Sequence, residues 1–347
     1  MYRRRILLIV LLGGLVVAGY FAFMVYRALF TPNTAFENEV AYLYIPTDAS
    51  YQEVRAQLDP LLADPETFDA VARQKKYPGN IRPGKYPVRK GMNNNEIVNS
   101  LRSANTPVRV SFNNQETPAS LAGRIADQIE ADSAGLLAAF TDPSFLGAHG
   151  WTQDQALLPY IPNSYEFFWN TGAEEFRQRM LQEYERFWSA ERLAKAREIG
   201  LEPEEVIALA SIVHKETAKP EERPRVAGLY LNRLRQGMAL QADPTVIYAI
   251  KKTSGNFDTI IKRVLYRDLE LDSPYNTYKY GGVPPGPIFM PDISAIDAVL
   301  NPESHEYLYM VADTENFGYH QFAKTLAQHN RNKEQYIRWI NSMNIRR

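Results

Sequence analysis

The sequence predicts an α+β protein with a single N-terminal transmembrane helix, a small α+β unit and a larger mixed α+β domain. Three observations predict this class. The chain opens with an uncharged apolar run, short strand patterns alternate with helical patterns after it, and 347 residues exceed the usual size of one compact core. Because the chain has no cysteine, apolar burial and not disulfides must hold these parts together.

The first element is the apolar run over residues 6–26, which follows Arg3, Arg4 and Arg5 and ends before Arg27. About 20 apolar residues are enough for a helix to cross a bilayer, so we expect a transmembrane helix at 6–28 behind a cytoplasmic N-terminus at 1–5. The leading arginines place the remainder on the outer (periplasmic) face of the cytoplasmic (inner) membrane. A cleavable signal peptide is the alternative, but its apolar core is normally shorter and ends in small residues.

Charge and composition narrow the class of ligand. The chain has 39 Lys and Arg against 40 Asp and Glu, and removal of the three leading arginines leaves about −4 for the rest. Nucleic-acid binding favours a basic patch, so we do not expect a nucleic-acid partner. Aromatic and amide side chains on a slightly acidic surface suit a sugar polymer better, although aromatic residues are usually core.

A linker at 29–36 leads into a small unit at 37–106. Its pattern predicts, in order, a strand at 40–45, a helix at 51–62, a second helix beginning at 68, a turn into a strand at 83–88, and a short helix at 95–101 after an Asn-rich turn.

The larger domain, 107–347, divides into a largely helical lead-in at 107–200 and a part at 201–347 that contains the motifs with the candidate site residues. A strand is expected at 108–112 and a helix from Thr117-Pro118. Residues 158–165 hold two prolines and cannot form regular helix. Residues 174–197 read as one long amphipathic helix. Further helices are expected around Glu216 and at 225–236, loops at 241–244, 273–278 and 281–288, strands at 307–311 and near 318–322, and a final helix to about 340.

Glu216 is the best site candidate because it lies on the apolar side of its helix. At about 100° per residue it falls beside Leu209, Ile212 and Val213, whereas Ser211, His214 and Lys215 point to the other side. Removal of a carboxylate from water raises its pKa, and a glutamate protonated near neutral pH can act as a general acid. The alternative is a structural ion pair with one of the arginines that follow, Arg223, Arg225 or Arg233.

Other chemistries find little support. The five histidines are scattered, His214 and Glu216 do not share a helix face, and no thiolate exists, so we expect no metal site and no cofactor. The G-x-S-x-G elbow of a serine hydrolase is missing. Cleavage of a glycosidic bond fits better, but ordinary glycosidases need a second carboxylate, and nothing in the spacing selects between Asp243 and Asp268.

Five segments resemble a known family, the endolytic murein transglycosylases of the MltG or YceG-like type. They are ASIVHKET (210–217), YLNRLRQGMALQADPTV (230–246), SPYNTY (273–278), GGVPPGPI (281–288) and HQFAKTLAQHN (320–330). The family segment usually reads IVEKET with two glutamates. His214 replaces the first, so the resemblance assigns the catalytic role to Glu216.

The resemblance implies cleavage of the β-1,4 bond between N-acetylmuramic acid and N-acetylglucosamine without water, which leaves 1,6-anhydro ends and needs one carboxylate. It implies that 37–106 is LysM-like, 107–347 is a YceG-like catalytic domain, and peptidoglycan strands and their synthases are partners. We assign further residues of the motif loops to a glycan groove: Asn232, Gln241, Asp243, Tyr275, Asn276, Tyr278 and His320. A structural role is open for each. A hydrolytic muramidase and a non-catalytic glycan-binding scaffold are the alternative functions.

Overall fold

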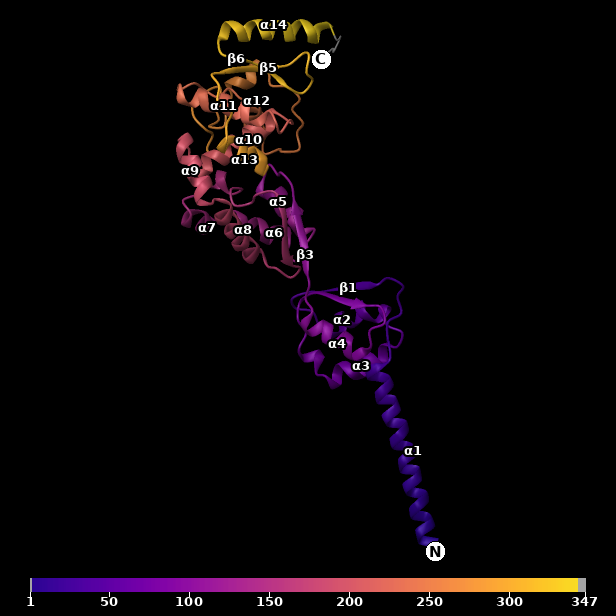
Figure 1. Cartoon of the computed structure of the whole chain (residues 1–347). Helices are drawn as coiled ribbons and strands as arrows, with labels where there is room; N and C mark the ends of the chain where they lie inside the picture. The colour runs from indigo at the N-terminus through magenta and orange to yellow at the C-terminus, as the bar shows by residue number, and fades with distance from the viewer. Residues whose placement is uncertain (1, 343–347) are drawn as a thin grey trace. The chain divides into compact units, whose positions relative to one another are not determined.

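The computed structural model describes residues 2–342 and is mixed α and β, mostly helical with small two-stranded sheets (Figure 1). It contains two compact units. The first runs from the N-terminus to Val110 and also includes Asp127–Ala131 and Tyr165–Gly172, and the second comprises the remainder. We retain the sequence-based domain limits, 37–106 and 107–347, as a proposal.

The first helix, α1 (Tyr2–Phe30), contains the predicted apolar run, and none of its residues is buried. Its length and composition suffice to cross a membrane, as in a membrane anchor or a signal sequence. At its C-terminal end the Ala28 carbonyl accepts a hydrogen bond from the Asn94 amide (2.8 Å), so the last turn is attached to the small unit.

The small unit follows the predicted order of elements. Strand β1 (Val40–Ile45) pairs antiparallel with β2 (Gly84–Arg89), so that Val40 lies opposite Arg89. Between them come α2 (Tyr51–Leu58), the short 3-10 helix η1 (Asp59–Leu61), α3 (Pro65–Gln74) and the 3-10 helix η2 (Tyr77–Gly79), and α4 (Asn94–Ser103) follows β2. Capping boxes start α2 and α4, where Ser50 pairs with Glu53 and Asn93 pairs with Glu96.

The segment from 107 to 200 differs from the prediction in two places. Its elements are β3 (Pro107–Phe112), α5 (Pro118–Ala126), α6 (Ser133–Phe140), α7 (Pro143–Ala148), the 3-10 helix η3 (Gln153–Gln155), β4 (Asn163–Phe168), α8 (Ala173–Phe187) and α9 (Ala190–Ile199). Strand β4, which pairs with β3, was not predicted. The single long helix at 174–197 is wrong, because Ser189 has an extended backbone and its hydroxyl caps α9 through the Arg192 N–H.

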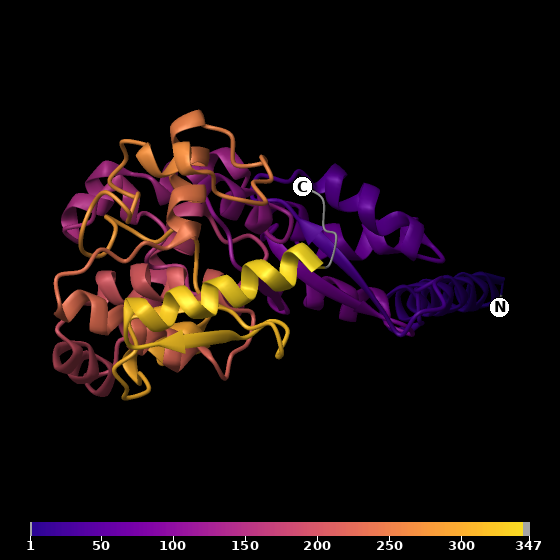
Figure 2. The same ribbon diagram turned by 90° about the horizontal axis from the view of Figure 1, so that it is seen from above.

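The remaining elements surround α10 (Pro203–Glu216), against which α9, α11 (Arg223–Arg235), α12 (Asp243–Ser254) and α13 (Ile293–Leu300) all pack. The 3-10 helix η4 (Tyr266–Glu270) precedes α13, and the hairpin of β5 (Tyr309–Ala312) and β6 (His320–Ala323) follows it. Figure 2 shows α14 (Leu326–Ser342) alongside this hairpin.

One expectation about this core needs correction, that of a loop around Asp243. In α10 every residue from Val206 to Val213 is buried, whereas His214 is half-buried and Lys215 is exposed. Ser211 is fully buried, where its hydroxyl donates to the Ala208 carbonyl (2.6 Å) and accepts the Ile288 N–H (3.0 Å). The stretch around Asp243 is not a loop, because Asp243 is the first residue of α12. Pro244 lies in the first turn, where a backbone N–H would have no partner within the helix, so its absence costs no hydrogen bond.

Candidate active site

Glu216 lies at the C-terminal end of α10, where the helix stops because Thr217 adopts an extended backbone. Its side chain lines a hollow of about 240 Å³ in the larger unit. The other lining residues come from α11, the segment before α12 and the first residue of α12, the 273–278 loop and the β5–β6 hairpin. They are Leu229, Tyr230, Arg233, Leu240, Gln241, Asp243, Tyr278, Met310, Val311, Ala312 and His320.

Tyr230 is the direct partner of Glu216. It lies on α11, is 2% exposed, and its hydroxyl donates to Oε1 of Glu216 at 2.7 Å. No other hydrogen bond to this carboxyl occurs within residues 2–342, so Oε2 is left for a group that enters the pocket. A single neutral donor orients the carboxyl without neutralising its charge.

Burial dominates the electrostatics of Glu216 and raises the pKa of its carboxyl to about 6. The Tyr230 hydroxyl, then the charge of His320, pull this pKa down, and the charge of Asp243 raises it. A carboxyl of pKa about 6 is protonated in roughly one molecule in ten at pH 7, whereas its ordinary value would leave far fewer. The direction of this shift agrees with the expectation that Glu216 is partly desolvated.

The arginines that could have made Glu216 a structural ion-pair partner are engaged elsewhere. Arg223 donates to the Ser294 hydroxyl (2.6 Å), and Arg225 pairs with Glu303 (3.0 Å). Arg233 is buried, and its guanidinium donates to backbone carbonyls, those of Leu308 (2.7 Å), Ala239 (3.1 Å) and Leu240 (2.8 Å). Among the described residues none of these arginines forms an ion pair with Glu216. The charge of Arg233 lowers the pKa of Glu216, but less than the Tyr230 hydroxyl and the charge of His320 do.

His320 enters the same pocket from β6 and is held by Glu222. The Glu222 carboxylate, 4% exposed, accepts the His320 backbone N–H (2.7 Å) and faces its Nδ1 (3.0 Å). A carboxylate only accepts, so Nδ1 carries the hydrogen and Nε2 is the free nitrogen of the ring. Burial alone would lower the pKa of His320, but the hydrogen bond and charge of Glu222 outweigh it and the pKa is raised.

Three further predicted residues, Gln241, Asp243 and Tyr278, line this pocket. The Tyr278 hydroxyl donates to Oδ1 of Asp243 (2.6 Å). Gln241 has a left-handed backbone (φ 52°), and its N–H donates to the Thr277 carbonyl (3.0 Å). A left-handed backbone is unfavourable for a residue other than glycine, and here it places Gln241 at the pocket. The hydrogen bond to Thr277 connects the 273–278 loop to the segment just before α12.

The other three predicted residues, Asn232, Tyr275 and Asn276, do not line this pocket. The Asn232 amide donates to the carbonyls of His305 (2.8 Å) and Tyr307 (3.2 Å). Asn276 is fully buried, and its amide donates to the carbonyls of Leu269 (2.9 Å) and Leu271 (2.8 Å). Tyr275 is fully buried and packs on the Tyr248 ring, with centroids 4.7 Å apart. In the structure all three hold loops in place.

Sequence reasoning missed three polar residues of the site. Tyr230 has no predicted role beyond its place in the 230–246 segment, Arg233 was considered only for an ion pair, and Glu222 has no predicted role. Glu222 had a signal that could have found it, since the largely polar run 217–223 follows directly on the candidate glutamate. The bonds from Tyr230 to Glu216 and from Glu222 to His320 span 14 and 98 residues, so local patterns do not reveal them.

Comparison with known proteins bears directly on this site. The model of the YceG-like family matches residues 43–335, which include every residue that lines the pocket. The chain belongs to the YceG-like family.

The YceG-like chain is also similar to individual proteins. A protein of Bacillus subtilis (strain 168) named endolytic murein transglycosylase is 28% identical over 335 residues, 91% of this chain and 90% of that protein. One of the same name from Streptococcus pneumoniae (strain D39) is 26% identical over 95% of this chain, which spans only 64% of its length. The crystal structure of a YceG-like protein from Listeria monocytogenes superimposes with a TM-score of 0.56 at 27% identity, over 85% of this chain and 99% of that one.

Proposed function

We propose that this YceG-like protein is an endolytic lytic transglycosylase that cleaves the MurNAc-β-1,4-GlcNAc bond of peptidoglycan and leaves 1,6-anhydroMurNAc ends. One observation carries the proposal. Glu216 is a recessed carboxyl of raised pKa with a single neutral donor and no bound cation, in a polar pocket that the family model covers. The relatives named endolytic murein transglycosylase supply the substrate class and the type of reaction.

In the first step protonated Glu216 gives its proton to the glycosidic O4. The C1–O4 bond of the muramic residue breaks, and the GlcNAc-terminated strand leaves with that proton on its new hydroxyl. The muramic C6 hydroxyl attacks the same C1, so an O6–C1 bond replaces the broken one. Glu216, now ionised, takes the O6 proton and returns to its initial state. No water is consumed, and the intramolecular nucleophile removes the need for a second carboxylate.

The remaining pocket residues suit the roles of binding and positioning. The Tyr230 hydroxyl on Oε1 directs Oε2 towards the sugar. Gln241, Asp243, Tyr278 and the Nε2 atom of His320 supply donors and acceptors for hydroxyl and acetamido groups. Asn232, Asn276 and Tyr275 act indirectly, because they hold the loops that carry these groups.

The proposal includes a cellular location. Helix α1 anchors the protein in the cytoplasmic membrane, with the short arginine-rich N-terminus inside and the catalytic domain on the outer face. From there the enzyme cuts nascent strands close to the membrane and ends their elongation, and peptidoglycan synthases are the expected partners. The LysM-like unit either binds glycan or positions the catalytic domain.

The test is product analysis with Glu216→Gln, which keeps the size of the side chain and removes the acid. Purified peptidoglycan is digested with full-length protein in detergent, and muropeptides are identified by mass spectrometry. Glu205→Gln is the matched control, since Glu205 is exposed on the same helix and glutamine also completes a capping box. The mechanism is supported if the wild type and the control release anhydro-ended products and Glu216→Gln does not. Release of these products by Glu216→Gln contradicts it.

A hydrolytic muramidase is the second candidate, because Asp243 lines the same pocket and could activate water. Asp268, the other carboxylate considered, lies in η4 and caps the Leu265 N–H (2.8 Å), and it does not line this pocket. Hydrolysis gives reducing ends, heavier than anhydro ends by one water. A scaffold without activity would retain undigested peptidoglycan and release no soluble product.

A further inference from the structure

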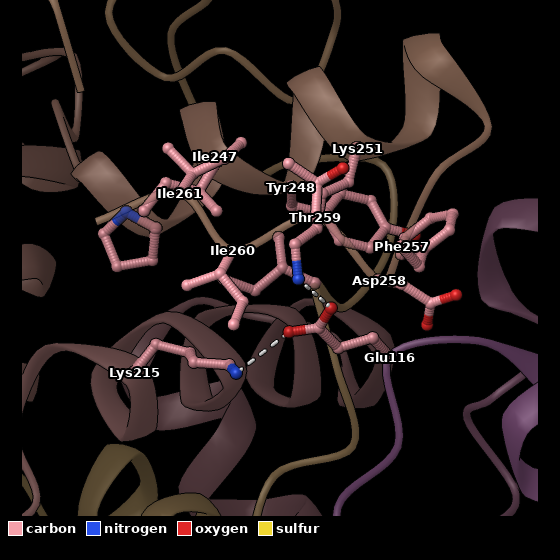
Figure 3. Close-up of a pocket in the computed structure, with 12 residues that line it drawn as sticks. Glu116, Lys215, Ile247, Tyr248, Lys251, Phe257, Asp258, Thr259, Ile260 and Ile261 are labelled. Carbon is pink, nitrogen blue, oxygen red and sulfur yellow. Dashed lines mark hydrogen bonds and ion pairs between the residues drawn. The ribbon is translucent and has the colours of Figure 1, made fainter. Parts of the chain in front are cut away.

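A second hollow, of about 370 Å³, lies in the larger unit and shares no lining residue with the Glu216 pocket (Figure 3). Its apolar walls are side chains of α12 and of the loop after it, chiefly Ile247, Tyr248, Phe257, Ile260 and Ile261. Ile260 is 83% exposed, which is unusual for a large aliphatic side chain at the edge of an apolar hollow. The reaction proposed above uses none of these residues.

A Lys–Glu–Lys cluster forms the polar side of this hollow. The Glu116 carboxylate lies between two ammonium groups, 3.1 Å from Lys215 and 2.7 Å from Lys251, as Figure 3 shows. Each ammonium has three N–H donors, and within residues 2–342 Glu116 is the only hydrogen-bond acceptor of either. The cluster therefore carries one excess positive charge and keeps donors free for another anion. Asp258, the other charged lining residue, brings the net charge of the whole lining to zero.

The two hollows share one wall, which is formed by the ends of two helices. At the end of α10, Lys215 lines the second hollow and the next residue, Glu216, lines the first. At the start of α12, Pro244 lines the second hollow and the preceding residue, Asp243, lines the first. Consecutive residues therefore line different hollows at two separate places, which makes the two hollows neighbours across the ends of α10 and α12.

We propose that the second hollow binds the peptide stem carried by the muramic residue, with a stem carboxylate on Lys215 and Lys251 and the alanyl methyl groups against Ile247 and Ile260. This inference rests on the proposed function and specifies its substrate as peptide-bearing glycan. Stems combine small apolar side chains with free carboxylates, which matches the two halves of the lining. A stripped glycan keeps only the lactyl carboxylate next to its ring and has no alanyl methyl groups for the isoleucine side chains.

The experiment compares two substrates that differ only in the stem, namely purified strands before and after treatment with an amidase that removes the peptides. Full-length protein is assayed in detergent for release of anhydro ends. We expect kcat/KM of the wild type to be about tenfold higher on stem-bearing strands, a difference of about 1.4 kcal/mol, since only these strands can place a stem carboxylate on the two ammonium groups. Ile260→Asp places a negative charge at the hollow, and Lys215→Met removes a donor but keeps an aliphatic stem. Each should bring the ratio of the two kcat/KM values close to one.

Matched controls come from the same loop. Lys262→Met and Leu265→Asp change exposed residues that do not line the hollow, so both should keep the wild-type ratio. A ratio of one for the wild type, with anhydro ends from both substrates, overturns the stem site and leaves the proposed function intact. Pocket variants that keep the wild-type ratio also overturn it. If the wild type makes anhydro ends from neither substrate, the proposed function fails and this inference fails with it.

Discussion

Replacement of Glu216 by glutamine should stabilise the protein at neutral pH while it removes strand cleavage. The carboxyl is recessed in a half-buried residue with one neutral donor, Tyr230, and desolvation raises its pKa from 4.5 to about 6. One pKa unit corresponds to about 1.36 kcal/mol, so ionisation of Glu216 lowers the free energy of unfolding by about 2 kcal/mol above pH 6. Glutamine resembles the protonated acid, and its carbonyl oxygen can still accept the Tyr230 hydrogen bond.

The sign follows from proton binding. Between pH 4.5 and 6 the folded protein holds a proton on Glu216 that the unfolded chain has lost, so this group makes stability fall as pH rises through that window. Below pH 4.5 the carboxyl is neutral in both the folded and the unfolded protein, so Glu216 no longer lowers the free energy of unfolding. The advantage of Glu216→Gln should therefore be near zero below pH 4.5 and grow to about 2 kcal/mol above pH 6.

The assay is urea denaturation of wild type and variant at a series of pH values, followed by tryptophan fluorescence. Trp151 and Trp188 lie in the same core cluster as α10 and report on the unit that contains the site. Glu205→Gln is again the control, and its difference from wild type should not follow this pH course. If Glu216→Gln is destabilising at pH 7–8, or if its effect does not vary between pH 4.5 and 6, uncompensated burial is not what governs this carboxyl.

Three further substitutions probe the same site. Tyr230→Phe removes the hydroxyl that lowers the pKa of Glu216. The basic limb of the pH profile of kcat/KM should therefore move up by about one pH unit. An unchanged limb would show that Tyr230 does not lower this pKa. Glu222→Gln removes the charge that raises the pKa of His320; NMR titration should find the pKa of His320 lower than in the wild type, and an equal or higher value would contradict the assignment. Asn276→Ala leaves the carbonyls of Leu269 and Leu271 without their buried donor, so the free energy of unfolding should fall by about 2–4 kcal/mol in a denaturant titration, while cleavage per folded molecule persists if Asn276 only holds its loop.

The small unit was the most predictable part of the fold, because its signals are local. Ser50 with Glu53 and Asn93 with Glu96 mark the starts of α2 and α4 within four residues, and the apolar alternation of 40–45 places β1 without knowledge of its partner. The predictions fail where a contact between residues far apart in the chain determines the local structure. Strand β4 exists because it pairs with β3, about 50 residues earlier, and its own sequence lies next to a proline-rich stretch that resembles a loop.

The sequence by itself determined that one carboxylate, Glu216, lies on the apolar side of a helix, because helical periodicity is a property of consecutive residues. It also determined the apolar N-terminal helix and, through five motif segments, the family. Only the tertiary structure decided which residues surround that carboxylate. It brought Tyr230, His320, Asp243 and Tyr278 to one pocket, turned Asn232, Tyr275 and Asn276 towards loops, and directed Arg233 to backbone carbonyls. The reason is that a hydrogen bond depends on distance in space, and residues far apart in the chain become neighbours only when α10, α11 and the β5–β6 hairpin pack together.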